Sequence, residues 1–501
     1  MTHHRKTYII VIGIKGNINY AFFCEYIAVI TFITKGAIMK KLKRILALTS
    51  ALSLIFTLTA CKNKKKSDTV GGLSSVLLES SIPENPLENK TLYWLSDYNL
   101  NPQENENRSA PLALFENTYG SKIEYIHVEA DEKYTRLAQM IQAGEQVDMF
   151  PFDMSALPQH SLNNLFQPLD DYYDILEMED EMWSDMKPLI EELKYKDSHY
   201  VIPYALSSPN LLTYSKTVIQ SLELEDPYEL YTQGKWTWDK FIELMKAFVQ
   251  KSPVKYGKYG ITGELGKGIL QSVGEPVVIN ENGTFSNNMN SPMIEKAENF
   301  IAEIRSSNLY LDSKATYFPK KKNVLFFAGS DWSLAETNAK YPDEEYMIVP
   351  FPKPDEASSH SSGFDISAIM LAANSQHGEA VAAYINCERI ARTTEEYLAI
   401  VKEKSIAENI TATGVLAGVI KENQYDALQT YLNPTVLKPV IDLGYGMGNA
   451  MYDTDTYNYE TRGIMNNLND GLLNYKNTAK DWATMKEKLS RTADVEIEKY
   501  N

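Results

Sequence analysis

Cysteine is scarce in this chain: 501 residues contain three, Cys24, Cys61 and Cys387, and no two of them form a CxxC pair. Only Cys387 lies beyond residue 61, so a chain that begins at Cys61 and is modified there has no partner for an internal disulfide. A protein of this size can build a sufficient apolar core without one. Cys387 sits in the helical pattern GEAVAAYINCERIA, and we expect it to be a small buried hydrophobe rather than a reactive thiol.

Metal-ligand and catalytic motifs are also missing. The seven histidines form no HExxH pair and no close cluster, so a dedicated zinc site is not expected. Asp453 begins like a calcium loop, but Tyr457, Asn458 and Ile464 stand where an oxygen ligand, a glycine and a glutamate are needed. The glycines of 444–448 lack the spacing of a dinucleotide fingerprint. We therefore expect no cofactor, no metal and no catalytic residues.

Positive charge is in the minority, with 49 lysines and arginines against 66 acidic residues and a net charge of −17. An acidic surface repels phosphates, which excludes nucleic acid as the expected partner. Acidic pairs such as Asp170 and Asp171 are more typical of solvated helix ends than of a glycosidase carboxylate pair. About 440 residues follow residue 60, which suits two or more lobes rather than one core.

One apolar run carries an export signal. Met39–Cys61 opens with lysines and an arginine, continues through Ile45 to Ala60 and closes on Cys61. The apolar part is roughly 15 residues, short for a spanning helix and typical of a signal peptide over 39–60. Its ending resembles the lipobox of bacterial lipoproteins, which implies that Cys61 is lipidated and anchors the protein to the outer face of the cell membrane. An uncleaved anchor helix, or a buried helix with a chance cysteine, is the alternative.

The segments on either side of the signal are set apart from the fold. Residues 1–38 hold two apolar runs ahead of a complete signal that has its own methionine, and we interpret them as an upstream mis-start or else as an extra membrane-associated segment. Residues 61–89 have no sustained period and are rich in polar residues, which indicates a flexible tether. The lysine-rich 62–66 run suits contact with anionic headgroups or a plain solvated stop.

From Thr91 the hydrophobic pattern alternates between strands and helices. It predicts strands at 91–96, 122–128 and 147–152 and helices at 110–119 and 134–143, with glycines at the two helix ends. This alternation is typical of right-handed βαβ units and of a sheet covered by helices. Ligands of such sheets bind beyond the carboxyl ends of the strands.

The order of several segments carries a family resemblance. LYWLSDYN, FENTYGSKIEYIHV, YTRLAQMIQAGEQVDMFPFD, HYVIPYALSSPNLLTYSKTVI, KKKNVLFFAGSDWSLAE and MIVPFPKP occur in this order. The stretch from about Thr91 to Asn501 thereby resembles the extracellular solute-binding proteins, family 1, of carbohydrate ABC transporters. The resemblance implies an α/β fold of the periplasmic-binding-protein-like type II, with two lobes, a hinge and a sugar in the cleft. We expect one lobe at 90–205 and 345–405 and the other at 206–344 and 406–501.

Candidate ligand contacts are aromatic and acidic side chains that follow predicted strands, because a sugar offers hydroxyls at its edge and C–H groups on its faces. Trp332 follows the strand predicted at 324–328 and resembles by position a stacking aromatic of maltodextrin-type binding proteins. The other candidates stand after further strands, in the first crossover or in an irregular loop: Asp97, Tyr98, Phe152, Asp153, Tyr204 with Ser207 and Ser208, Asp331, Asp365 with Gly363 and Phe364, and Tyr445.

Each candidate also has a purely structural interpretation. Asp97 is equally placed to cap the turn after its strand, Phe152 to join the core, Tyr204 to line the hinge and Trp332 to pack between lobes. The resulting hypothesis is a monomeric transport receptor that binds a mono- or oligosaccharide and presents it to an ABC permease. The alternatives are a secreted carbohydrate-active enzyme with two cleft carboxylates and a surface binding protein for a non-sugar solute.

Overall fold

The computed structural model describes residue 87 and residues 91–102, 108–255, 257–320, 322–406, 420–453, 462–473 and 481–501. The predicted signal peptide, Cys61 and nearly all of the predicted tether lie outside these residues. No helix of the described part of the chain is both long and apolar enough to cross a membrane.

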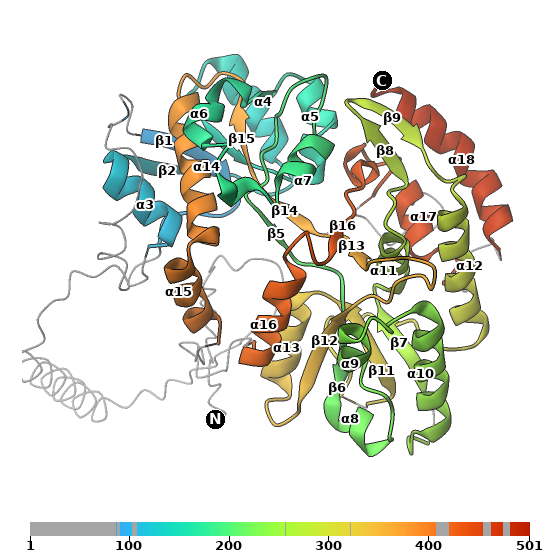
Figure 1. Cartoon of the computed structure of the whole chain (residues 1–501). Coiled ribbons are helices and arrows are strands. Elements are labelled where there is room, and N and C mark those ends of the chain that lie inside the picture. Colours follow the sequence, from blue (N-terminus) through green and yellow to red (C-terminus); the bar gives the residue numbers. More distant parts are fainter. Residues whose placement is uncertain are drawn as a thin grey trace, which may run out of the picture. The chain divides into compact units, whose positions relative to one another are not determined.

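The first lobe is built on a five-stranded sheet in the order β2-β1-β3-β15-β4. β1 runs parallel to β2 and β3, while β15 runs antiparallel to β3 and β4. In Figure 1 the late helix α14 lies beside the early helix α3 on this lobe. The elements are β1 Thr91–Ser96, α3 Ala110–Tyr119, β2 Lys122–His127, α4 Lys133–Ala143, β3 Met149–Pro151, β4 Phe166–Gln167, β15 Ile369–Ala372 and α14 Gly378–Thr393.

The βαβ prediction for the start of this lobe is confirmed. Helix α3 has Pro111 in its first turn and ends at Gly120, whose φ of 61° is a left-handed conformation that glycine adopts without strain. Helix α4 ends in the same way at Gly144 and buries Leu137 and Met140 on one face. Local glycine stops and one apolar face therefore set the lengths of both helices.

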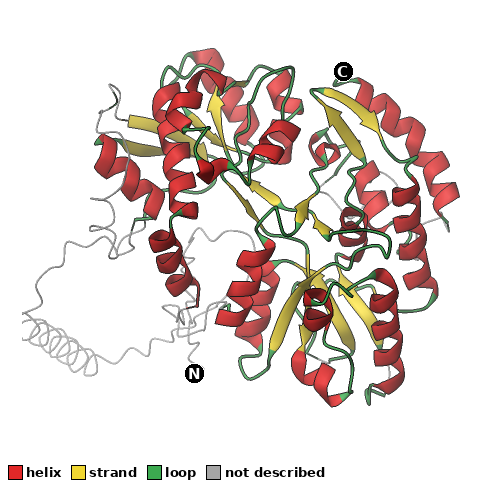
Figure 2. Ribbon diagram, viewed as in Figure 1, coloured by secondary structure: helices red, strands yellow, loops and turns green. Residues whose placement is uncertain are grey.

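The second lobe repeats this plan with a sheet in the order β10-β7-β11-β6-β12. β7 is parallel to β10 and β11, and β6 is antiparallel to β11 and β12. Figure 2 shows helices flanking the strands of both sheets. The elements are β6 Leu211–Ser215, α8 Lys216–Ser221, α9 Pro227–Thr232, α10 Trp238–Lys251, β7 Tyr259–Gly263, β10 Tyr310–Leu311, β11 Val324–Gly329, α13 Asp331–Lys340, β12 Tyr346–Pro350 and α16 Glu422–Tyr431.

Shorter elements and a helical layer complete the chain. In the first half these are η1 Met154–Ala156, α5 Gln159–Leu162, η2 Asp170–Tyr172, α6 Tyr173–Leu176, η3 Glu181–Trp183 and α7 Lys187–Glu192. In the second half they are α11 Leu265–Ser272, β8 Val278–Glu281, β9 Thr284–Asn287, α12 Pro292–Ser306, α15 Glu395–Ile406, η4 Leu443–Gly446, α17 Ile464–Asp470 and α18 Trp482–Glu498. Cys387 on α14 is buried and free, as its helical pattern predicts.

Two short strand pairs connect the sheets. β5 Ala205–Ser207 pairs antiparallel with β14 Asp365–Ser367, and β13 Ser361–Ser362 pairs parallel with β16 Lys438–Pro439. The sequence predicts one strand over 366–372, but the chain divides there between β14 and β15, which belong to different sheets. β12 belongs to the second sheet, although the sequence places the return to the first lobe at residue 345.

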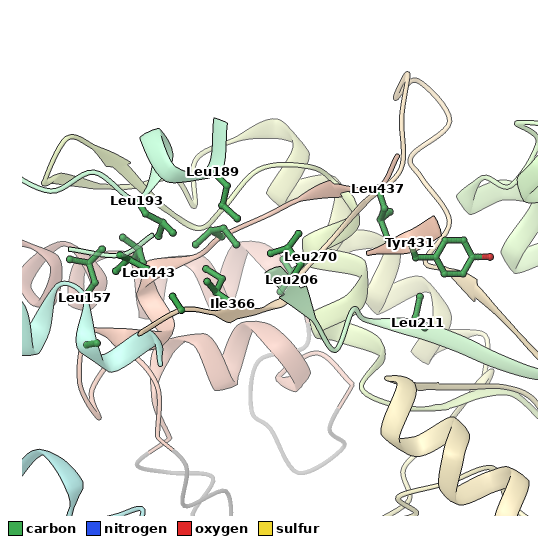
Figure 3. Packing of buried hydrophobic residues seen from close by; sticks show 14 of the residues in the cluster. Leu157, Leu189, Leu193, Leu206, Leu211, Leu270, Ile366, Tyr431, Leu437 and Leu443 are labelled. Carbon is green, nitrogen blue, oxygen red and sulfur yellow. The ribbon is translucent and has the colours of Figure 1, made fainter. Parts of the chain in front are cut away.

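The apolar core continues through these connecting strands. Leu206 of β5 and Ile366 of β14 are buried, and Figure 3 shows them among leucines such as Leu157, Leu270 and Leu443 that come from distant parts of the chain. The segments that link the sheets are therefore packed, and the apolar side chains beside them hold their positions.

Glu298 on α12 is a buried carboxyl whose two oxygens find no hydrogen-bond partner among the described residues, and its exposed fraction is 0%. Burial raises the pKa of Glu298 well above its ordinary value. Because the pKa of Glu298 is higher in the folded than in the unfolded protein, protonation of this carboxyl stabilises the fold, and the contribution is fully present below pH ~4.5. That stability is lost as the pH rises toward the folded-state pKa.

We expect Glu298→Met to raise the free energy of unfolding by ~1–3 kcal/mol at neutral pH, because it removes an unsatisfied buried polar group. The gain should be larger at pH 8 than at pH 4, as measured by urea unfolding at both values. Glu295→Met on the exposed face of the same helix is the matched control and should change little. A gain that is independent of pH would contradict the assignment.

Candidate ligand-binding site

Trp332 lies at the junction of strand β11 and helix α13. β11 ends at Gly329 and α13 begins at Asp331, with the Ser330 N–H donating to Ser333 Oγ at 3.2 Å across the first turn. A Cβ at Gly329 would meet Ser333 Oγ at 2.5 Å, so the tight turn requires glycine. The Trp332 side chain is 52% exposed, which makes it one of few exposed large apolar side chains among the described residues. It is therefore free to cover an apolar face of a ligand.

Asp331, the residue before Trp332, carries a carboxyl that is influenced by the charge of Asp365. Oδ1 of Asp331 is buried and has no hydrogen-bond partner among the described residues. Burial raises the pKa of Asp331, and the negative charge of Asp365 raises it further. Asp365 is exposed on β14, where it lies opposite Ser207 of β5. The structure thus brings Asp331 of the second lobe near Asp365 of the connecting strands.

Asp153 is held by its own lobe. Its carboxylate accepts from Tyr134 Oη at 2.5 Å and from the Ser155 N–H at 2.8 Å, and it pairs with Lys133 Nζ at 2.5 Å. The side chain caps η1 and ties it to α4. Phe152 is half-buried, and its N–H donates to Ala368 O at 3.1 Å. Asp153 therefore serves the first lobe's own structure and offers a ligand little free hydrogen-bonding capacity.

Tyr98 stands at the carboxyl end of β1 and is 43% exposed. Its ring packs edge-on against Trp94 with 5.4 Å between centroids, and its N–H donates to Ser96 Oγ at 3.2 Å. Packing raises the pKa of Tyr98, and the charges of Glu388 and Asp97 add to the effect. Asp97 itself is half-buried and accepts a hydrogen bond from Ser96 Oγ at 3.4 Å.

Tyr204 lies just before β5 and is 8% exposed. The Arg392 guanidinium stands 4.8 Å from its ring centroid, and its backbone N–H donates to Ser367 O at 3.0 Å. Burial raises the pKa of Tyr204, with further contributions from Glu388 and Tyr98. Tyr204 is therefore mainly a packing residue that lies close to the exposed Tyr98.

Tyr445 on η4 is half-buried, and its hydroxyl donates to Asn469 Oδ1 at 2.8 Å. Its ring meets Tyr452 edge-on at 5.0 Å, and Lys267 Nζ lies 5.5 Å from the ring centroid. Burial raises its pKa well above the ordinary value, and the charges of Asp442 and Glu264 contribute.

Glu264, whose charge raises the pKa of Tyr445, is hydrogen-bonded to the second sheet. Its N–H donates to Ala328 O at 3.1 Å, so it stands where β7 and β11 end together. Glu264 and Lys267 are not among the candidates chosen from the sequence, whereas Tyr452 lies in the irregular loop that contains Tyr445. Glu264 follows the strand at 259–263 in the run ITGE, which is the same signal that singled out Asp331.

The η1 and η4 turns approach each other closely. A Cβ added at Gly446 would lie 1.8 Å from Met154 O, so only glycine permits this approach. Met154 follows Asp153 and Gly446 follows Tyr445, which brings the loop after β3 of the first lobe beside the Tyr445 group. Taken together, the described candidates offer an exposed indole, an exposed tyrosine ring and carboxylates at strand ends beside the connecting strands. This arrangement suits the binding of a solute that has polar edges and an apolar face.

A two-lobed α/β protein of this kind, with candidate contacts at strand ends, is a solute-binding protein. The family described as "Bacterial extracellular solute-binding protein" matches residues 112–401, and the chain belongs to this family. Members of the family are binding proteins that act outside the cytoplasm. No curated protein matches the chain.

Solved structures share the fold at low identity. The sugar-binding protein MalE from Xanthomonas citri is 13% identical with a TM-score of 0.57, and the match covers 82% of this chain and 98% of that one. The galacto-N-biose/lacto-N-biose I-binding protein of Bifidobacterium longum is 12% identical with a TM-score of 0.54, covering 83% and 99%. UgpB from Mycobacterium tuberculosis is 16% identical with a TM-score of 0.52, covering 77% and 94%. The fold is therefore the periplasmic-binding-protein-like type II fold that the resemblance implies.

Proposed function

We propose that this protein is the lipid-anchored receptor of an ABC transporter, which binds a mono- or oligosaccharide between its lobes and delivers it to the permease. The observation that carries the proposal is the exposed Trp332 ring in the first turn of α13, next in sequence to Asp331, whose pKa the charge of Asp365 raises. An indole covers the C–H face of a sugar ring, and carboxylate oxygens accept hydrogen bonds from its hydroxyls. Asp365 is the exposed carboxylate of the two and can accept such a bond.

The similar structures support a sugar as ligand, since MalE is described as a sugar-binding protein and the Bifidobacterium longum protein was solved in complex with lacto-N-biose. UgpB holds glycerophosphocholine on the same fold, so the fold alone does not select a sugar. In this proposal the exposed Trp332 ring and the carboxylate oxygens select a sugar over other solutes. In this proposal the first-lobe wall of the cleft is formed by Tyr98, Asp97 and Phe152. The structure around the cleft is held in place by Asp153, Tyr204 and Tyr445, which are not proposed as direct contacts.

We expect Trp332→Ala to weaken binding of the preferred sugar about 10- to 100-fold, because stacking contributes roughly 1–3 kcal/mol. The midpoint of thermal unfolding should hardly move, since the ring is exposed. Isothermal titration calorimetry measures the affinity, and Trp332→Phe, which keeps an aromatic face, should retain most of it. Equal affinity in the alanine variant would exclude Trp332 from the site.

We also propose that Cys61 carries the lipid. Cys61→Ser should abolish incorporation of radiolabelled palmitate and move the protein from the membrane fraction to the medium. Cys24→Ser is the matched control and should leave labelling and location unchanged, because translation from Met39 would omit that residue. Membrane retention of Cys61→Ser would instead favour an uncleaved anchor.

A further inference from the structure

A separate cavity lies between α7 of the first lobe, β8 and the chain before η4. Its volume is about 180 Å³. None of the residues proposed above as sugar contacts lines it. The lining residues are Glu192, Leu193, Pro276, Ile279, Asn280, Ile441 and Leu443. Five of them are apolar, so the cavity is mainly apolar, with two polar residues in its wall.

The polar groups around the cavity are nearly all committed to each other. Asn280 Nδ2 donates to Glu192 O at 2.9 Å and to Lys194 O at 3.2 Å, while its Oδ1 accepts from the Gly283 N–H at 2.8 Å. Asp442 is flanked by two lining residues, and its carboxylate accepts from the Val277 N–H at 2.6 Å.

Asp442 Oδ1 also accepts from the amides of Val278 and Gly444. Burial raises the pKa of Asp442 to about 6, against the opposing effect of these hydrogen bonds. Its oxygens are therefore occupied and are poor acceptors for a further ligand.

The side chain of Glu192 is the exception. Its carboxylate has no hydrogen bond or ion pair among the described residues. Glu192 lines the cavity and is exposed to solvent. Partial burial raises the pKa of its carboxyl, and the positive charge of Lys438 lowers it. Lys438 Nζ is itself directed to Gly274 O at 3.0 Å. The cavity thus combines apolar walls with one uncommitted acidic group that water can reach.

We propose that this cavity is a second ligand site, for a small primary alkylammonium compound whose chain packs on Leu193, Ile279 and Leu443 while its ammonium pairs with Glu192. An apolar cavity of about 150 Å³ is large enough to hold benzene, so a chain of about five carbons fits. An ammonium is the complement that an uncommitted carboxylate requires. The inference goes beyond sugar capture and stands without it.

The test uses n-pentylammonium chloride and 1-pentanol as probes of the full-length protein, at constant ionic strength, by calorimetry or saturation-transfer NMR. We expect saturable binding of the ammonium, and binding of the alcohol about tenfold weaker, because a charge-assisted bond is lost. Glu192→Gln should weaken the ammonium about tenfold and leave the alcohol unchanged. Ile279→Phe, which fills the cavity, should abolish both.

Glu281→Gln is the matched control. It removes one acidic charge from β8, next to the lining residue Asn280, and the variant should bind both probes like the original protein. The proposal is overturned if the ammonium does not saturate, if Glu192→Gln binds it as well as the original protein does, or if Glu281→Gln loses as much. Sugar binding measured on the same variants reports separately on the transport role, so the two proposals can fail independently.

Discussion

Replacing Arg389 by alanine is expected to lower the free energy of unfolding by about 3–5 kcal/mol, because it removes a buried guanidinium and leaves two backbone carbonyls and the partly buried Asp185 carboxylate without their donor. Arg389 on α14 is 3% exposed. Its Nε donates to Met182 O at 2.7 Å, its Nη1 donates to Tyr204 O at 3.0 Å, and its Nη2 pairs with Asp185. The guanidinium also lies 5.5 Å from the Trp183 ring centroid. Burial lowers the pKa of Arg389, but the neighbouring Asp185 opposes that shift and favours the charged form.

The Arg389 prediction is checked by urea unfolding followed by tryptophan fluorescence. Arg136→Ala is the matched control, because Arg136 pairs with Glu145 at 2.8 Å on the surface of the same lobe. An exposed pair contributes about 0–1 kcal/mol, so this variant should unfold almost like the original protein. Equal losses in the two variants would show that burial of Arg389 does not matter. Because Tyr204 precedes β5, Arg389→Ala should also loosen the connecting strands.

The second large effect is expected for Asp148→Ala, at about 3–5 kcal/mol, since two donors lose their acceptor in the core and His377 loses a close carboxylate neighbour. Asp148 is 0% exposed. Its carboxylate accepts from the Tyr93 N–H at 2.9 Å and from Ser375 Oγ at 2.7 Å, and it lies 3.0 Å from His377 Nδ1. The side chain thereby joins β1 to the start of α14, two segments far apart in the sequence.

The same unfolding measurement tests Asp148. Asp148→Asn keeps one acceptor oxygen and should lose less than the alanine variant. Asp426→Ala provides the surface control, because Asp426 pairs with Lys402 at 2.7 Å on an exposed face. A loss below 1 kcal/mol for Asp148→Ala would mean that water or a neighbouring group replaces the carboxylate.

The sequence predicts the parts of the fold that depend on local signals. Gly120 and Gly144 end their helices where the pattern places the stops, and the strands between them follow. Sheet membership is a long-range property, and the sequence does not determine it in the same way. β12 reads as an apolar strand in either lobe, and only its pairing with β6 decides between them. The break between β14 and β15 likewise arises because the two halves find different partners.

The candidate site shows the same division. Its residues were chosen because they follow strands, and this rule selects Trp332 and Tyr98, which are exposed in the structure. The rule does not tell which side chains are already engaged. The Asp153 carboxylate is bound by Lys133 and Tyr134 of α4, about 20 residues earlier in the chain. Hydrophobic periodicity does not predict such side-chain contacts. Glu264 was missed because its strand lies outside the segments that carry the resemblance.

The most direct test is calorimetric titration of the full-length protein with a panel of mono- and oligosaccharides, followed by analysis of the recovered sugars. We expect that at least one sugar binds saturably at a single site, that it is recovered unchanged, and that Trp332→Ala weakens this binding. Binding of a non-sugar solute alone, or turnover of the sugar, would rule out the proposed role as a sugar receptor.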